Sequence, residues 1–351
     1  MRIGGSVWVK RCILSTAAVA IGLALAGNAF AESKCKMGRI AELPLRAGDP
    51  LPITDGEING QKVGILLGTG AKMNLILRSA ARKLDLTRRG AGRVFSVAGE
   101  SHAEVTQVDE FRIGQSVWKN WRVRVSGEGS FGSDVAVLLG DPFFEQLDVE
   151  FDLAHNAVRL YEAKDCDGVS LAYWATEPAG EVPIEASRGI RFTVSINGKP
   201  LRAELDSGST ASVLSKPDAA RLGVTPESLG TVASACITTG GDTKRTLDSW
   251  VGQFESFAIG NERIRNPRIR FADLWQHTTY VETGSRLANR MAGQPGMLLG
   301  SDFLRAHRVL VARSQRKMYF TYAGGTVFLG APSKGCNQPS GGNPPADPPT
   351  K

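Results

Sequence analysis

Short runs in which apolar and polar residues alternate make up most of this chain, and such runs are typical of half-buried strands. In the second half, Phe192–Ile196 alternates, Asn197-Gly198 favours a two-residue hairpin turn, and Leu201–Leu205 predicts the returning strand. The first half repeats this order, with Asn59-Gly60 as the turn and Val63–Leu67 as the returning strand. The pattern therefore predicts many short strands, few helices and the same hairpin twice.

A loop of related sequence follows each of these hairpins. Leu67–Ala71 reads Leu-Gly-Thr-Gly-Ala, and Leu205–Ser209 reads Leu-Asp-Ser-Gly-Ser, at the same distance after the two hairpin turns. A short helix is predicted after each loop, over Leu77–Leu84 and over Pro217–Leu222, with Ser215 as the N-cap of the second. We therefore interpret the chain as an internal duplication.

Further landmarks occur once in each half and extend the duplication to two all-β lobes. The paired landmarks are the hairpin tips Val97–Glu100 and Thr239–Asp242, the turns Ile113-Gly114 and Ile259-Gly260, the apolar-apolar-Gly triplets Leu138–Gly140 and Leu298–Gly300, and the closing strand pairs Leu147–Phe151 with Val158–Tyr161 and Val309–Ala312 with Met318–Tyr322. We expect each strand pair to close its own half.

These landmarks divide the 351-residue chain into five segments. We predict a signal peptide over 1–31, a first lobe over 32–165, a connector over 166–181, a second lobe over 182–331 and a tail over 332–351. The connector is rich in Gly, Ala and Pro. The tail is Pro, Gly, Ser and Asn with little apolar content, which predicts disorder.

The N-terminal segment has the layout of a secretory signal peptide. Arg2, Lys10 and Arg11 precede an apolar run, and Ala29-Phe30-Ala31 offers a small-x-small cleavage site. The run is short for a membrane anchor, although an uncleaved anchor is the alternative interpretation, and no later stretch approaches the roughly 20 apolar residues that span a bilayer. We therefore expect an exported protein, periplasmic or secreted, without stable membrane insertion.

The cysteines agree with export. Cys12 lies in the signal peptide, and Cys35, Cys166, Cys236 and Cys336 remain. An even number of cysteines in an oxidising compartment indicates two disulfides, for which three pairings are possible. Because Cys35 and Cys166 bracket the first half, we favour that pair together with Cys236 and Cys336. Free buried thiols are the alternative.

Charge and ligand chemistry narrow the range of partners. The formal charge is +7, of which three basic residues belong to the signal peptide, so the rest of the chain carries about +4. The basic residues are scattered rather than interleaved with aromatic residues, which predicts a solvated surface and no nucleic-acid partner. The four histidines lie far apart and the cysteines lack metal-ligand spacing, so we predict no metal and no cofactor.

Each half resembles a lobe of the retropepsin-type aspartic peptidases, and the two-lobed chain is similar to pepsin. Three features carry this resemblance: an apolar strand, an Asp-(Thr/Ser)-Gly loop and a downstream apolar-apolar-Gly, over roughly residues 43–330. The resemblance implies two acid-protease-like β-barrel lobes with short helices and a cleft between them. In such enzymes two carboxylates, one from each lobe, share a proton and activate a water for peptide-bond hydrolysis.

The resemblance also assigns residues to the site. Asp206 is the catalytic carboxylate of the second lobe, and the hydroxyls of Thr69 and Ser207 are expected to bond across the lobe interface. Gly208 lets its loop turn tightly, and Gly70 keeps the matching place in the first loop. The substrate-facing flap is expected at Val97, Ala98 and Gly99, with Gly240 and Gly241 at the matching tip of the second lobe.

The first loop departs from this pattern, because Gly68 stands where such an enzyme has its first aspartate. One carboxylate cannot both hold a proton for the carbonyl oxygen and take one from water. Asp55 and Asp85 lie near in sequence but outside the loop frame, and Asp141 is expected under the loop rather than in the cleft. Loss of the pair therefore puts activity in doubt.

Three functions follow for an exported protein of this family with a peptide or protein partner. An active endopeptidase requires a homodimer in which two second lobes each give Asp206, although the attached first lobe competes for that face. A monomeric, non-catalytic relative that holds an extended peptide in its cleft fits the missing acid better. A structural envelope protein stapled by disulfides is the third interpretation, and the sequence offers no repeat array for it.

Overall fold

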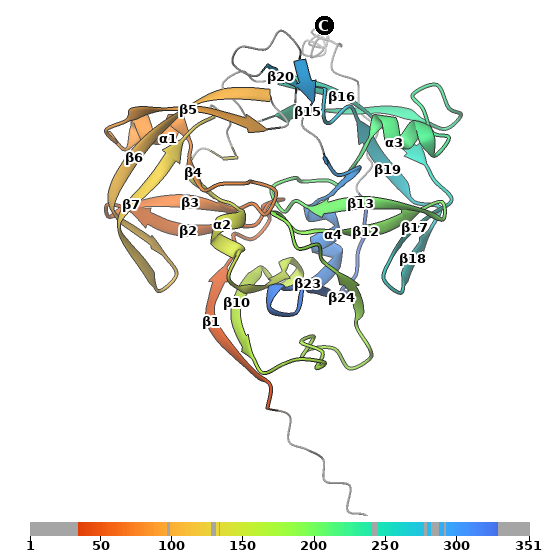
Figure 1. Cartoon of the computed structure of the whole chain (residues 1–351), viewed down its shortest axis with the longest axis horizontal. Coiled ribbons are helices and arrows are strands. Elements are labelled where there is room, and N and C mark those ends of the chain that lie inside the picture. Colours follow the sequence, from red (N-terminus) through yellow and green to blue (C-terminus); the bar gives the residue numbers. More distant parts are fainter. Residues whose placement is uncertain are drawn as a thin grey trace, which may run out of the picture. The chain divides into compact units, whose positions relative to one another are not determined.

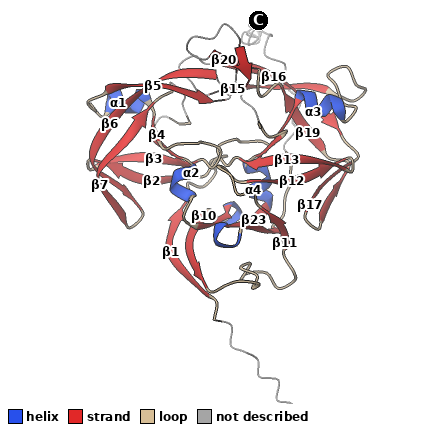
Figure 2. Ribbon diagram, in the orientation of Figure 1, coloured by secondary structure: helices blue, strands red, loops and turns tan. Residues whose placement is uncertain are grey.

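The computed structural model describes residues 34–96, 99–127, 131–132, 134–239, 245–276, 279–281, 288–290 and 293–328. Within these ranges the strands form three large sheets and one two-stranded ribbon, and the helices are short (Figures 1 and 2). The predicted signal peptide, the whole predicted tail and the flap residues Val97, Ala98, Gly240 and Gly241 lie outside the described residues.

The first lobe is built on a seven-stranded sheet in the order β2-β3-β8-β4-β7-β6-β5. A further pairing between β2 and β6 closes six of these strands into a barrel, as predicted for this half. The strands are β2 (Ile53–Ile58), β3 (Gln61–Leu67), β4 (Leu75–Ile76), β5 (Arg89–Ser96), β6 (Gly99–Ile113), β7 (Ser116–Val125) and β8 (Val135–Leu139).

The second lobe is built on a nine-stranded sheet in the order β15-β16-β19-β14-β22-β13-β12-β17-β18, and β20 pairs with β21 separately. The strands are β12 (Arg191–Ile196), β13 (Lys199–Leu205), β14 (Val213–Ser215), β15 (Val232–Thr239), β16 (Arg245–Gln253), β17 (Ser256–Ile259), β18 (Glu262–Arg265), β19 (Arg268–Ala272), β20 (Thr279–Val281), β21 (Ala288–Arg290) and β22 (Met297–Leu299).

The predicted hairpins are present in both lobes. Asn59 and Gly60 join β2 to β3 with φ of 50° and 78°, and Asn197 and Gly198 join β12 to β13 with φ of 50° and 74°. Two successive residues with positive φ match the right-handed twist of the flanking strands, and Asn-Gly adopts this turn readily. The local sequence therefore sets the register of the strand that leads into each loop.

The two lobes also share the pairing that carries the loops. In the first lobe β3 runs parallel to β8, with Leu67 opposite Leu139. In the second lobe β13 runs parallel to β22, with Leu205 opposite Leu299. All four leucines are fully buried in one apolar cluster that extends through both lobes, and each contributes roughly 2 kcal/mol by its burial. Both loops therefore start from strand ends fixed in the core.

The third sheet joins the lobes and differs from the prediction, in which each closing strand pair belonged to its own half. Its order is β1-β10-β9-β23-β24-β11, so that β9 of the first half pairs with β23 of the second. Both strands are almost wholly buried, and a buried strand left as a sheet edge would hold unpaired backbone groups. The strands are β1 (Lys36–Pro44), β9 (Asp148–Asp152), β10 (Ala157–Lys164), β11 (Gly180–Pro183), β23 (His307–Ala312) and β24 (Lys317–Tyr322).

Helices follow the loops as predicted, and two more were not predicted. The predicted helices are α1 (Arg78–Lys83) and α3 (Lys216–Arg221), and the Ser215 side chain caps α3 by accepting the N–H of Asp218 at 3.2 Å. The unpredicted helices are α2 (Asp141–Phe144) and α4 (Ser301–Ala306), each of which begins directly after an apolar-apolar-Gly triplet. Two 3-10 turns, at Leu153–His155 and Arg313–Gln315, complete the described elements.

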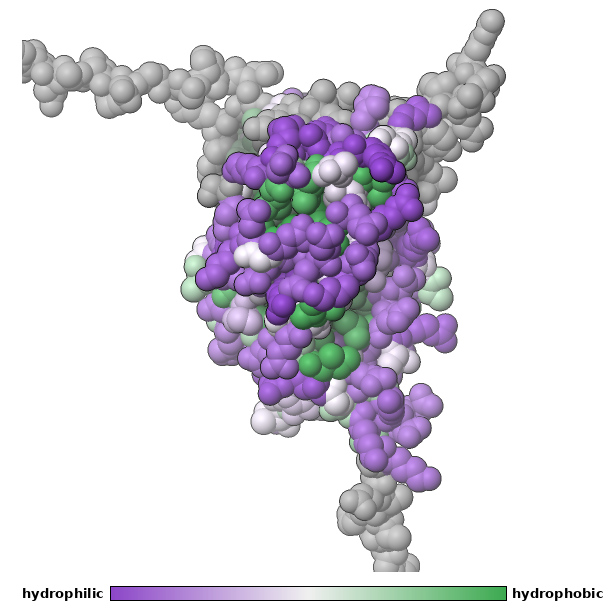
Figure 3. All heavy atoms as spheres, turned by 90° about the vertical axis from the view of Figure 1, so that its left-hand side faces the viewer, coloured by the Kyte–Doolittle hydropathy of each residue, from purple (hydrophilic) through white to green (hydrophobic). Residues whose placement is uncertain are grey.

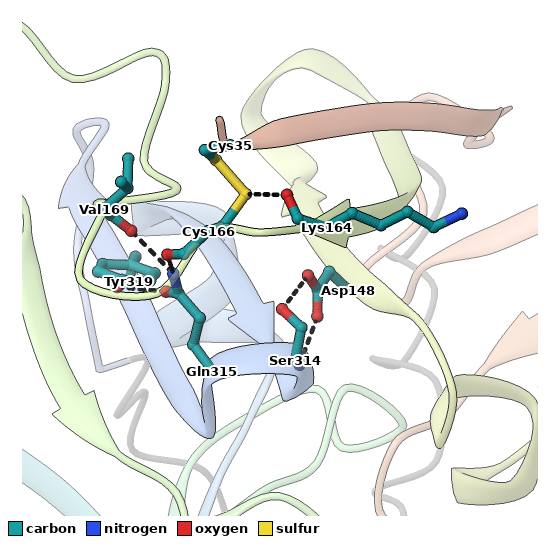
Figure 4. Close-up of a disulfide and its surroundings, with 8 residues drawn as sticks. All are labelled: Cys35, Asp148, Lys164, Cys166, Val169, Ser314, Gln315 and Tyr319. Carbon is teal, nitrogen blue, oxygen red and sulfur yellow. Dashed lines mark hydrogen bonds between the residues drawn. A yellow bond between two sulfur atoms is a disulfide. The ribbon is translucent and has the colours of Figure 1, made fainter. Parts of the chain in front are cut away.

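The predicted disulfide between Cys35 and Cys166 is present and spans 131 residues of sequence (Figure 4). It ties the start of β1 to the segment after β10. The Gln315 amide donates to the Val169 carbonyl at 2.8 Å, so a turn of the second half also holds this segment. Cys236 is also disulfide-bonded, and its predicted partner Cys336 lies outside the described residues.

The surface agrees with a solvated protein. Seen from the side of the first lobe, it is mostly hydrophilic with separate hydrophobic areas (Figure 3). Among the residues that the structure describes, no helix has the length and apolar character needed to cross a bilayer.

Removal of the first disulfide should lower the free energy of unfolding. Closing a loop of this length restricts the unfolded chain, and losing such a bond typically costs about 2–5 kcal/mol. We expect the double variant Cys35→Ser/Cys166→Ser to unfold at a clearly lower urea concentration than the wild type. An unchanged midpoint in urea would show that the bond contributes nothing to stability.

Candidate active site

The two loops leave their strands in the same way. Gly68 donates its N–H to the Leu139 carbonyl at 2.9 Å, and Asp206 donates its N–H to the Leu299 carbonyl at 2.9 Å. Each loop then turns back on itself, because the N–H three residues on bonds the carbonyl of Gly68 or of Asp206 at 3.1 Å. The first loop therefore keeps the backbone geometry of the second although its acid is missing.

Two hydroxyl groups join the loops across the lobes. The Thr69 hydroxyl donates to the Leu205 carbonyl at 2.7 Å and accepts the Ser207 N–H at 3.1 Å. The Ser207 hydroxyl donates to the Leu67 carbonyl at 2.6 Å and accepts the Thr69 N–H at 3.0 Å. Both side chains are fully buried. We call these four contacts the inter-lobe hydroxyl bonds.

The apolar-apolar-Gly triplets support the loops from below. Gly140 donates its N–H to the Asn74 amide oxygen at 2.9 Å, and Gly300 donates its N–H to the Ser212 hydroxyl at 2.9 Å. A Cβ on Gly140 would stand 2.4 Å from the Ala71 carbonyl, so only glycine fits this approach. The roles of Asn74 and Ser212 were not predicted from the sequence. Asn74 follows Gly68 at the same distance at which Ser212 follows Asp206, and this repeat could have indicated both.

The Asp206 carboxylate lies against the first loop. It accepts the N–H of Gly208 at 3.0 Å, and a second N–H, that of Gly70, also acts on it. A Cβ placed on Gly70 would stand 2.4 Å from the Asp206 carboxyl carbon, so the carboxylate occupies the space directly over this glycine. A single acid is thus held by both loops.

The surroundings of Asp206 favour its neutral form. Burial raises the pKa of its carboxyl to about 6, and the nearby Glu204 carboxylate acts in the same direction. The N–H groups of Gly208 and Gly70 and the Lys72 ammonium lower the pKa and only partly offset burial. Asp206 therefore changes charge near neutral pH, in the range of a general acid or base.

An apolar side chain lies against the position at which the expected aspartate is missing. A Cβ built on Gly68 would stand 2.5 Å from the Leu138 Cδ1 atom, which is closer than carbon atoms approach in proteins. Leu138 lies on β8, directly before the buried Leu139, and is only partly buried. An aspartate at Gly68 therefore requires the Leu138 side chain to turn away.

The other acids of the first half are engaged elsewhere. Asp55 pairs with Arg46 at 2.6 Å, and its side chain is 79% exposed. Asp85 is exposed at the end of α1. Asp141 is buried, begins α2 directly beneath the first loop and holds the Arg313 guanidinium. None of these three carboxylates therefore takes the position of the missing first aspartate.

Two small apolar clusters lie next to the loops, one in each lobe, apart from the main core. Both include the leucine that precedes a buried leucine of the triplets, Leu138 or Leu298. The first contains Leu51, Ile53, Leu66 and Val135 with Phe131 and Leu138, and the second contains Val213, Ala272, Leu274 and Leu298 with Ile237 and Trp275. Most of these side chains are buried, and they pack around the strands that carry the loops.

The expected flap lies partly within the described residues. β5 and β6 form a hairpin in which Ser96 pairs with Gly99, and the tip residues Val97 and Ala98 lie outside the described residues. In the second lobe β15 ends at Thr239, before the undescribed glycines.

The described part of the chain contains no group of three or more His, Cys, Asp or Glu side chains suited to a metal ion.

The sequence of the chain matches the aspartyl protease family model over residues 54–143 and again over residues 192–303. The two matches together cover more than half of the chain, and each contains one loop and one apolar-apolar-Gly triplet. The chain therefore belongs to the aspartyl protease family, in a duplicated form. No curated protein matches it.

Replacing Asp206 should stabilise the fold at neutral pH. Because the pKa is raised, the folded protein keeps a proton on Asp206 between about pH 4 and pH 6, where the unfolded chain has lost it. The free energy of unfolding therefore falls as pH rises through this range. At pH 7 the Asp206→Asn variant should be more stable than the wild type by up to about 3 kcal/mol, and at pH 4 by much less.

Urea unfolding at both pH values measures this difference. Asp85→Asn is the matched control, because Asp85 is exposed and Asn tolerates its positive φ. Equal or lower stability of Asp206→Asn at pH 7 would contradict a buried, ionising carboxylate.

Proposed function

We propose that this chain is an exported, non-catalytic member of the aspartyl protease family that binds extended peptides between its lobes. The observation that carries the proposal is the site at Gly68, where the residue has no carboxylate and the Leu138 Cδ1 atom lies 2.5 Å from the position of a Cβ. The rest of the family's loop geometry is intact, including the inter-lobe hydroxyl bonds. Such a site retains the means to hold a peptide and lacks the paired acid.

The chemistry of hydrolysis requires two roles at once. One carboxylate takes a proton from the attacking water while its protonated partner donates to the carbonyl oxygen. General acid or base help is worth typically about 10²–10⁴-fold, and Asp206 can supply only one of the two at any moment. The aspartates nearest in sequence to the first loop, Asp55 and Asp85, are both exposed, and Asp55 pairs with Arg46.

A homodimer with two Asp206 residues is disfavoured by the same contacts. Pairing of two second lobes requires the face on which Ser207 already bonds Leu67 and Thr69 of its own chain. Breaking these buried bonds leaves backbone groups unpaired, at about 1–3 kcal/mol for each group. The attached first lobe is present at high local concentration and therefore holds the face against a second chain.

Peptide binding is supported by the retained loops and by the hairpin of the first lobe. An extended peptide places alternate side chains on opposite faces and leaves backbone groups free to pair. A hairpin such as that of β5 and β6 can add main-chain hydrogen bonds to a bound strand. Export is supported by the signal-like N-terminus and by the disulfide between Cys35 and Cys166.

Restoring the acid should convert the binder into a peptidase. Gly68→Asp supplies the second carboxylate, and Leu138→Ala removes the side chain that would meet its Cβ. We expect the double variant Gly68→Asp/Leu138→Ala to cleave an unfolded protein between about pH 3 and pH 7, faster than Gly68→Asp alone. Cleavage should be blocked by a transition-state peptide analogue and lost when Asp206→Ala is added.

The single variant Leu138→Ala is the matched control and should remain inactive. Wild-type protein that cleaves as fast as the double variant would refute the proposed function. A double variant that folds but stays inert would show that more than the acid has been lost.

A further inference from the structure

An ion pair crosses from the first lobe to the second beside Asp206. Lys72, two residues after Gly70, reaches Glu204, which lies two residues before Asp206 on β13. The Glu204 carboxylate raises the pKa of Asp206 and the Lys72 ammonium lowers it. The pair therefore belongs to the surroundings of the candidate site, and the family resemblance assigned no role to either residue.

Glu204 breaks the symmetry of the two lobes. The equivalent residue of the first lobe, two before Gly68, is Leu66, which belongs to an apolar cluster. Glu204 is 96% buried, and the Arg191 Nε atom donates to its second oxygen at 2.8 Å. A Cβ on Gly189 would stand 2.4 Å from the Lys72 ammonium, so the backbone closes over the pair. Such a buried carboxylate is retained only with both of its cations.

The cluster carries more positive charge than negative. Lys72 and Arg191 face one carboxylate, Glu204, and the nearby Asp206 is partly neutral near pH 6. Asp141, the other buried acid beside Gly189, accepts the Gly189 N–H at 2.9 Å and holds a different arginine. The local charge is therefore close to +1 when Asp206 is protonated and close to zero when it is ionised.

Lys72 and Arg191, rather than Glu204, have N–H groups that remain accessible to a ligand. The Lys72 side chain is 37% exposed, whereas that of Glu204 is 4% exposed, so a ligand reaches the ammonium and not the carboxylate. An ammonium has three N–H donors, and Glu204 takes one of them among the described contacts. Arg191 uses its Nε on Glu204 and one further nitrogen on the Gly293 carbonyl, and its side chain is 20% exposed.

We propose that Lys72 and Arg191 form a carboxylate subsite at one end of the peptide site, which selects peptides that carry a glutamate or aspartate side chain. This inference rests on the proposed peptide binding. Glu204 acts as a positioning residue, because it fixes both cations at the lobe boundary and leaves their free N–H donors for the ligand. A basic ligand side chain is disfavoured, since it would have to displace Lys72 from a buried partner.

Binding of a matched peptide series tests the subsite. Fluorescently labelled, apolar extended peptides carry one glutamate at successive positions, each beside a peptide with glutamine in its place. Kd is measured by polarisation at pH 5.5, where Asp206 is mostly protonated and a peptide glutamate is mostly ionised. We expect one position at which glutamate binds about tenfold more tightly than glutamine, as for one charge-assisted hydrogen bond to a partly exposed cation. Lys72→Met should reduce this ratio to about one, and Lys72→Arg should preserve most of it.

Lys62→Met is the matched control, because Lys62 is an exposed lysine of the same lobe on β3. It should leave the ratio unchanged, and the glutamine peptides should bind Lys72→Met as they bind the wild type. Equal affinity for glutamate and glutamine at every position overturns the subsite and leaves the proposed function standing. A preference that survives Lys72→Met overturns the role of Lys72. Absence of binding by every peptide overturns both the subsite and the proposed function.

Discussion

Two buried hydroxyl groups, on Thr69 and Ser207, hold the two lobes in the register on which the rest of the site depends. Each donates to a carbonyl at the end of the opposite strand and accepts an N–H from the opposite loop. Four backbone groups that would be buried without partners are satisfied in this way, and each unpaired group would cost about 1–3 kcal/mol. Because the loops hold one another through these bonds, their geometry does not require a carboxylate in each loop. The first loop therefore keeps its shape although Gly68 stands in the place of the first aspartate.

The second loop keeps an acid that the fold itself does not need. Asp206 is half-buried against Gly70 and the pKa of its carboxyl is raised to about 6, so its ionisation at neutral pH costs stability. A chain under selection for stability alone would gain from losing such a group. The charged pair of Lys72 and Glu204 beside it is a second polar feature that apolar packing would replace without loss. Both features are better explained by a ligand between the lobes than by the needs of folding.

The sequence predicts those parts of the structure that depend on local pattern. The Asn-Gly turns set the hairpins, Ser215 marks the start of α3, and the spacing of the cysteines indicates the disulfide at Cys35. The repeated landmarks identify the two loops because each motif is contiguous. By contrast, the pairing of β9 with β23 joins residues far apart in sequence, and buried edges of either lobe satisfy the same apolar pattern.

The side-chain contacts at the lobe interface could likewise not be predicted from the sequence. The absence of an acid at Gly68 is plain from the letters, but the position of Leu138 against it depends on how β3 and β8 pack. The contact between Lys72 and Glu204 depends on the placement of one whole lobe on the other. The partner of a lysine cannot be predicted from the sequence, because the sequence contains many acids that a long, flexible side chain could reach.

The most direct test of a peptide-binding site without hydrolysis is mass spectrometry of peptides incubated with the wild-type protein and with Asp206→Ala, across the range in which Asp206 titrates. We expect peptides to co-purify with the wild-type protein at their full length, and we expect no cleavage that depends on Asp206. Peptide fragments that accumulate with the wild type and are absent with Asp206→Ala would contradict this expectation.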